Sequence, residues 1–332
     1  MYFGILGFCN LDISGKRMKY LDIAKGIGIL LVVIGHCIPD ASTPNGVSII
    51  SYKILFDLIY SFHMPLFFFI SGYMISREKM FSRGQTVSDV LRKRFYRLIV
   101  PYIVVGLCYA PFKMLLSQFA NKPYDINNLW MIVIGVNPDG ELWFLYSLFV
   151  VHLISAIWGF RVSRIGLLVS VAFCVIGAVF PIVTKFIFFF LLGIYVRSEY
   201  PDFVINLSGV WVVVAAAFFL IGNYCAIFLR ISNMFLFTAV SGIILTLWCS
   251  YYLSSMKCKL VFLLDLLGTF SMDIYIFSDI IKISFRIILW NKMHLYTMSF
   301  LICTVVSIVL PVLISKHIIR KNKWLSKVFL GN

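Results

Sequence analysis

The chain has 332 residues, of which 61% are hydrophobic and only 13% are charged, and its formal net charge is +15. Soluble domains contain roughly 45–50% apolar and roughly 25% charged residues. This composition excludes a soluble enzyme, a disordered chain, a coiled coil and a collagen-like rod, because most of the surface must face lipid. We therefore predict an all-α, polytopic membrane protein, whose excess of Lys and Arg is typical of cytoplasmic loops and does not indicate a nucleic-acid partner.

Ten segments have the apolar character and roughly the 20-residue length of a spanning helix. They cover residues 20–38, 54–76, 96–116, 142–160, 164–180, 183–197, 209–229, 234–253, 270–290 and 297–317. Most basic residues fall in connections that are cytoplasmic if both termini are inside, so we predict cytoplasmic termini. The expected organisation is a short cytoplasmic segment at 1–19, a ten-helix membrane domain at 20–320 and a basic cytoplasmic tail at 321–332.

The first expected span carries ionisable residues, which are costly inside a membrane and indicate function. Asp22 and Lys25 are three residues apart and can pair on one helix face. Lys25 and His36 are eleven residues apart, so both point the same way, about 16 Å apart along the axis. Lys25 could instead be an anchor whose ammonium reaches the membrane surface, and His36 could be a hydrogen-bonding packing residue.

His63, in the second span, lies two residues before Pro65, which frees backbone groups nearby. We expect His63 at a depth comparable with His36, so the two imidazoles could act as base and proton relay. The alternative is a structural histidine that satisfies the interrupted backbone.

A basic cluster precedes the third span and contains Arg92, Arg94 and Arg97. It could bind anionic lipid headgroups or clamp the phosphates of a nucleotide-type cofactor.

The long connection before the fourth span ends with Glu141 and Trp143. A carboxylate and a tryptophan suit the hydroxyls and the apolar face of a sugar, although an interfacial aromatic belt is the alternative. The eight cysteines include no pair with metal-ligand spacing, so we expect no metal.

Four stretches of the chain together resemble one family, the acyltransferase-3 family of integral-membrane O-acyltransferases, and most of all its polysaccharide and sugar O-acetylase branch. These stretches are LDIAKG…VVIGH at 21–36, FHMPLFFFISGY at 62–73, RFYRLIVPY at 94–102 and LWFLYSLF at 142–149. Weaker matches lie at 188–195 and 267–275. The family carries an Arg at the position of Lys25 and, in many members, a His at the position of Ser278.

The resemblance implies ten spans in the cytoplasmic (inner) membrane and transfer of an acyl group, usually acetyl, from acetyl-CoA to a hydroxyl of a cell-surface polysaccharide or its lipid-linked sugar precursor. The expected roles are catalysis by His36 and His63, acetyl-CoA binding by Lys25, Arg92, Arg94 and Arg97, acceptor binding by Glu141 and Trp143, and support from Asp22 and Asp279. Expected partners are the sugar or polysaccharide acceptor, membrane lipid and envelope-polysaccharide biosynthesis proteins.

A transporter or flippase for a lipid-linked sugar or a small anion is the alternative, because it also combines many helices with polar residues in the membrane. That class predicts inverted repeats in the two halves. No repeat is visible, and the strongest polar residues cluster in the first 100 positions.

Overall fold

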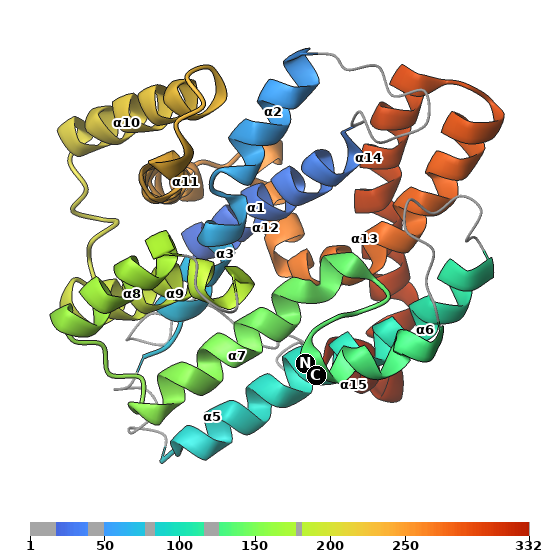
Figure 1. The fold of residues 1–332 in the computed structure, drawn as a ribbon, viewed down its shortest axis with the longest axis horizontal. Helices are drawn as coiled ribbons and strands as arrows, with labels where there is room; N and C mark the ends of the chain where they lie inside the picture. The colour runs from blue at the N-terminus through green and yellow to red at the C-terminus, as the bar shows by residue number, and fades with distance from the viewer. Residues whose placement is uncertain (1–17, 39–49, 77–83, 116–125, 177–180, 332) are drawn as a thin grey trace.

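A computed structural model describes residues 18–38, 50–76, 84–115, 126–176 and 181–331, and all regular secondary structure within them is helical (Figure 1). The all-α prediction is confirmed. The elements in chain order are α1 (Lys19–Cys37), α2 (Ile50–Tyr60), α3 (His63–Tyr73), α5 (Val87–Arg94), η1 (Phe95–Ile99), α6 (Val100–Leu115), η3 (Ile126–Ile134), η4 (Gly140–Leu142), α7 (Trp143–Ile157), α8 (Arg164–Ile176), α9 (Pro181–Glu199), α10 (Gly209–Ile227), η5 (Ser232–Met234), α11 (Phe235–Ser255), α12 (Lys259–Thr269), α13 (Ser271–Arg286), η6 (Ile287–Lys292), α14 (Tyr296–Ile314), η7 (Ser315–Ile319) and α15 (Lys323–Leu330).

Seven helical units within the described ranges are long and apolar enough to cross a membrane, and an eighth is possible if α12 and the following helix form one span with an 81° bend. The described part of each of the ten expected spans is mostly helical, but α8, with 13 residues, and α9 are not among the seven. Ten spans and cytoplasmic termini therefore stay predictions. The expected segment at 1–19 lies almost entirely outside the described residues.

The second span is broken between α2 and α3, and Pro65 explains the position of this break. A proline ring clashes with the carbonyl four residues earlier, here that of Ser61, and it supplies no N–H. The chain accordingly leaves the helix at Ser61 and Phe62 and resumes it at His63. This break sets the position of His63, the first residue of α3.

Helix α1 runs through the middle of the bundle and packs against α2, α3, α11, α12, α13 and α14 (Figure 1). Its crossing with α12 requires glycine on both helices. A Cβ added to Gly26 would lie 2.0 Å from the carbonyl oxygen of Leu264, and one added to Gly268 would lie 1.8 Å from that of Asp22. Small residues that let two backbones touch are the usual basis of helix association in membranes.

Candidate functional site

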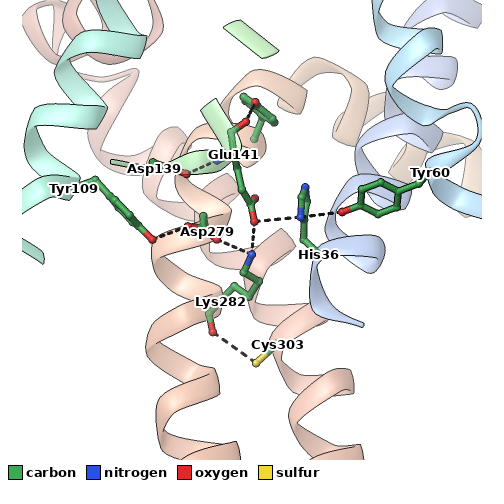
Figure 2. Close-up of polar contacts among 9 residues, drawn as sticks. His36, Tyr60, Tyr109, Asp139, Glu141, Asp279, Lys282 and Cys303 are labelled. Atoms are coloured by element: carbon green, nitrogen blue, oxygen red, sulfur yellow. Dashed lines mark hydrogen bonds and ion pairs between the residues drawn. The ribbon is translucent and has the colours of Figure 1, made fainter. Parts of the chain in front are cut away.

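The polar centre of the protein forms where the last turn of α1 meets η4 and the end of α2 (Figure 2). Nδ1 of His36 lies 3.2 Å from the Glu141 carboxylate and 3.2 Å from the Tyr60 hydroxyl. An ionised carboxylate only accepts hydrogen bonds, so a neutral His36 that donates from Nδ1 to Glu141 keeps Nε2 as an acceptor. A carboxylate that orients an imidazole in this way is the arrangement of a general base.

Lys282 of α13 holds the Glu141 carboxylate in place from the other side. Its ammonium pairs with Glu141 and, at 2.5 Å, with Asp279 one turn earlier (Figure 2). Asp279 also accepts a hydrogen bond of 2.7 Å from the Tyr109 hydroxyl of α6. Lys282 is only 7% exposed, which is tolerable for a charged group because two carboxylates surround it.

The backbone of Glu141 is fixed by its own neighbours. Asp139 caps η4, and its Oδ1 accepts a 2.9 Å hydrogen bond from the Glu141 amide. Tyr275 of α13 donates its hydroxyl proton to the Glu141 carbonyl. Asp139 is fully buried, and this burial, together with the nearby Asp279 carboxylate, raises its pKa above the usual range for an aspartate.

His63 lies beside this centre without joining its hydrogen bonds in the part of the chain described. Its ring is 1% exposed, and Nδ1 donates a 2.7 Å hydrogen bond to the Ile59 carbonyl, which also accepts a 3.4 Å hydrogen bond from the Phe62 amide. The Tyr60 ring lies between the two imidazoles, 4.7 Å from His63 and 6.0 Å from His36 between ring centroids. Both expected histidines thus contact the same tyrosine ring, from its two neighbouring helices α1 and α3.

A basic cavity lies at the other end of α1. Its walls include four cationic side chains, which are Lys25, Arg94, Arg97 and Arg320. Lys25 lies 3.6 Å from the Asp22 carboxylate, and Arg320 lies 2.7 Å from the Asp273 carboxylate. The expected pairing of Asp22 with Lys25 is confirmed. Arg92 is exposed on α5 and does not line this cavity.

One face of α1 connects the cavity with the polar centre. Lys25, Ile29 and Val32 all line the cavity, and His36 follows Val32 by one helical turn. At the same end the wall includes Tyr275, the residue that contacts Glu141. Along α1 the cavity wall therefore changes from cationic at Lys25 to apolar at Ile29 and Val32, toward His36.

The two residues expected to meet a sugar are not together. Glu141 faces His36 and Lys282, as described above. Trp143, at the start of α7, packs its ring against Phe186 at 5.4 Å and against Phe144.

Sequence reasoning missed Lys282, Tyr60 and Tyr109. Lys282 lies within the expected span at 270–290, and no role is assigned to it from the sequence. Its spacing of three from Asp279 was the available signal, because two opposite charges at i and i+3 in an apolar helix stabilise each other and indicate a buried site.

The fold and the site together define a multi-pass helical membrane protein with a buried acid–base centre at the end of a basic cavity. Residues 18–316 match the family model of an acyltransferase domain. The chain therefore belongs to the acyltransferase-3 family, as the sequence motifs predict.

Two curated relatives are nodulation proteins. The chain is 28% identical over 147 residues to the nodulation protein NolL of Mesorhizobium japonicum, which is 43% of this chain and 36% of that protein. It is 39% identical over 70 residues to NolL of Sinorhizobium fredii, covering 21% of this chain and 19% of that protein. The matches thus span about a third and a fifth of the relatives' lengths. No solved structure matches the chain.

Proposed function

We propose that the protein is an O-acyltransferase that moves an acetyl group from acetyl-CoA to a hydroxyl of a cell-surface polysaccharide or of its lipid-linked sugar precursor. The observation that carries this proposal is the single face of α1 that links the basic cavity at Lys25 to the His36–Glu141 pair. One end suits an anionic donor and the other suits proton removal from an alcohol.

The residues of the basic cavity fit the donor. The diphosphate and phosphate of CoA need cations, and Arg94 and Arg97 supply guanidinium groups that suit phosphate oxygens. The pantetheine arm needs a narrow apolar path, and Ile29, Val32 and Phe144 line one. Arg92, exposed on α5, is assigned to anionic lipid headgroups at the membrane surface.

His36 acts as the general base in this proposal. Its Nε2 takes the proton of the acceptor hydroxyl as the oxygen attacks the thioester carbonyl, and the C–S bond then breaks. The proton passes from Nε2 to the departing thiolate, so His36 ends neutral. Glu141 keeps the proton of the free imidazole on Nδ1 and stabilises the imidazolium that forms. Acetyl-CoA supplies the activated acyl group.

The remaining expectations belong to the same proposal. The protein would lie in the cytoplasmic membrane with the basic cavity on the cytosolic side, where acetyl-CoA is made. Glu141 is assigned to His36 and not to the acceptor, because its carboxylate is occupied by His36 and Lys282. Enzymes that build envelope polysaccharide are the expected partners, since they supply the acceptor.

The experiment compares cells that carry the wild-type chain, the His36→Ala variant or no chain. Alkali-labile acetate on cell-surface polysaccharide is measured, and membrane expression is checked by blot. Acetate that occurs only with the wild-type chain supports the proposal. Acetylation by the variant at the wild-type level would show that His36 is not the base. Equal acetate in all three strains would contradict the proposal and favour transport, which substrate flux would then test.

A further inference from the structure

Two residues in the wall of the basic cavity come from a part of the chain that follows the matched family domain. The match ends at residue 316, whereas Arg320 and Leu330 lie beyond it, and both line the cavity. Leu330 is 2% exposed and is the last residue of α15, a helix of eight residues. Residues 320–331, which we call the α15 segment, thus complete a cavity whose other walls belong to the family domain.

Arg320 is held by the first turn of α13. Its Nε donates to Oδ1 of Asp273 at 3.1 Å, and its Nη2 donates to Oδ2 at 2.7 Å. The guanidinium also lies 4.4 Å from the centroid of the Phe270 ring. Nη1, the third nitrogen, makes no hydrogen bond or ion pair with any residue of the described ranges. Because Arg320 lines the cavity, Nη1 is available to an anionic ligand, and the other two nitrogens keep the guanidinium in place.

Helix α15 is capped at both ends. At its start, the Asn322 side chain accepts hydrogen bonds from the amides of Trp324 and Leu325, at 2.9 and 3.3 Å. At its end, Gly331 takes the left-handed conformation with a φ of +65°, and its amide donates to the Ser326 carbonyl. Such caps satisfy the backbone groups that a helix end leaves open. Since a helix this short is marginal on its own, the caps and its packing on α6 and η7 hold it in place.

Gly331 also touches the backbone of η1. A Cβ added to Gly331 would lie 2.3 Å from the Tyr96 carbonyl oxygen and 2.4 Å from the Arg97 Cα. A side chain at this position would therefore push the two backbones apart. Arg97 is part of η1 and lines the basic cavity. The end of α15 thus packs directly on the turn that carries one of the cavity's cations.

We infer that the α15 segment is part of the donor site, in which Arg320 binds a phosphate of CoA through Nη1 and Gly331 positions Arg97 for the same anionic part of the donor. The inference rests on the proposed function. It adds a binding residue and a positioning contact that lie outside the family domain. The uncharged pantetheine arm of the donor needs neither of them, and this difference makes the inference testable.

The test compares the binding of CoA with that of pantetheine, which lacks the phosphates and the nucleoside of CoA. The full chain is purified in an uncharged polyoxyethylene detergent, and dissociation constants are measured by calorimetric titration at constant ionic strength. Inorganic phosphate and phosphatidylglycerol are titrated as well. Thermal unfolding without ligand reports on the folding of each variant. We expect the wild-type chain to bind CoA about tenfold or more tightly than pantetheine, because only CoA reaches the cations.

The Arg320→Lys variant keeps a cation for Asp273 but offers no third nitrogen. It should reduce the preference for CoA about fivefold or more, the effect of one lost hydrogen bond to a charged group, and leave pantetheine binding unchanged. Gly331→Ala should reduce the preference as well, because the added methyl group forces α15 away from Arg97. Gly84→Ala is the matched control, since Gly84 has a φ of +60° but an added Cβ meets nothing within 4 Å. The control should keep the wild-type preference.

An unchanged preference for CoA in Arg320→Lys or in Gly331→Ala would overturn the role given to that residue, even if the variant unfolds at a lower temperature. An equal reduction in Gly84→Ala would overturn the positioning contact. Binding of phosphatidylglycerol but not CoA, lost in Arg320→Lys, would assign the segment to membrane lipid and overturn the inference. CoA binding with wild-type preference in every variant would contradict this inference alone. No CoA binding by the wild-type chain would contradict the proposed function, and the inference with it.

Discussion

At the residue scale, the most informative contact is the one between His36 and Glu141, because it decides which imidazole nitrogen is available to an acceptor. Tyr60 competes for the same Nδ1 at the same distance of 3.2 Å. If Glu141 is the orienting partner, Nε2 is the base. If Tyr60 donates its proton to Nδ1, the roles of the two nitrogens are exchanged.

The Glu141→Gln variant tests this choice. The amide of Gln can donate a hydrogen bond to Nδ1, which favours the tautomer with its proton on Nε2 and removes the basic nitrogen. The neutral amide also cannot stabilise the imidazolium. We expect kcat to fall by about 10²-fold or more, measured as thiol release from acetyl-CoA. Tyr60→Phe removes only a hydroxyl from the same nitrogen and should change kcat by less than about tenfold. The reverse order of effects would assign the orienting role to Tyr60.

Lys282 should matter for stability as much as for catalysis. The Lys282→Met variant leaves two buried carboxylates without their cation, and removal of one partner from a buried ion pair costs about 3–5 kcal/mol. Asp279→Asn on its own leaves Lys282 paired with Glu141 and should cost less. Thermal unfolding in detergent provides the comparison.

The double variant Asp279→Asn with Lys282→Met completes the cycle. Because the two residues are in direct contact, their effects should not add, and the double variant should unfold at a higher temperature than Lys282→Met alone. Simple additivity would show that the ion pair is not the source of the cost.

The sequence predicts contacts along one helix better than contacts between helices. Asp22 with Lys25, and the common face of Lys25 and His36, follow from helix geometry alone. The pairing of Glu141 with His36 and Lys282 joins residues more than 100 positions apart. Periodicity does not encode such a contact, so Glu141 is recognised as polar and functional from the sequence while its partners are not.

At the scale of elements, the apolar runs predict where helices lie. Local irregularities in those helices decide which side chains face a cavity. Three π-helical turns occur in the described ranges: η1 joins α5 to α6, whereas η6 and η7 end α13 and α14. Arg97 of η1 lines the basic cavity, and η7 leads directly into Arg320, which lines it too. Single π-helical turns inside α-helices are frequent at functional sites. The hydrophobic pattern of the sequence does not predict them.

The crossing of α1 and α12 gives a sharp test at this scale. The Gly268→Ala variant places a methyl group against the Asp22 carbonyl, where the available distance is 1.8 Å. The two helices must move apart, at a cost of about 1–3 kcal/mol or more. They would also displace Asp22 and Lys25 at the mouth of the basic cavity. A lower unfolding temperature and a higher KM for acetyl-CoA are expected.

Gly209→Ala is the matched control for this change. Its added Cβ meets nothing within 4 Å in the structure, at the start of α10. The control should therefore unfold at or slightly above the wild-type temperature, because alanine favours helices over glycine. An equal loss in both variants would show that the glycine crossing is not what limits stability.

At the scale of the whole molecule, the basic cavity and the polar centre lie toward opposite ends of α1. The basic cavity is bordered by the first turns of α1 and α13, whereas His36 and Lys282 belong to later turns of the same two helices. In the proposed reaction the donor would approach His36 from the Lys25 end and the acceptor from the other end. This arrangement requires that the two ends open to opposite sides of the membrane.

Labelling of single cysteines tests that requirement. Lys93 on α5 and Met293 after η6 are exposed residues, the first next to Arg94 of the basic cavity and the second beyond the His36 end of α13, and neither lines the basic cavity. Each is replaced by cysteine in a chain whose native cysteines are changed to serine. Spheroplasts are then treated with a membrane-impermeant maleimide. Met293→Cys should be labelled in intact spheroplasts, whereas Lys93→Cys should be labelled only after the membrane is permeabilised. Labelling of both residues from the same side would contradict a path that takes its donor from the cytosol and its acceptor from outside, even if acetyl transfer itself is observed.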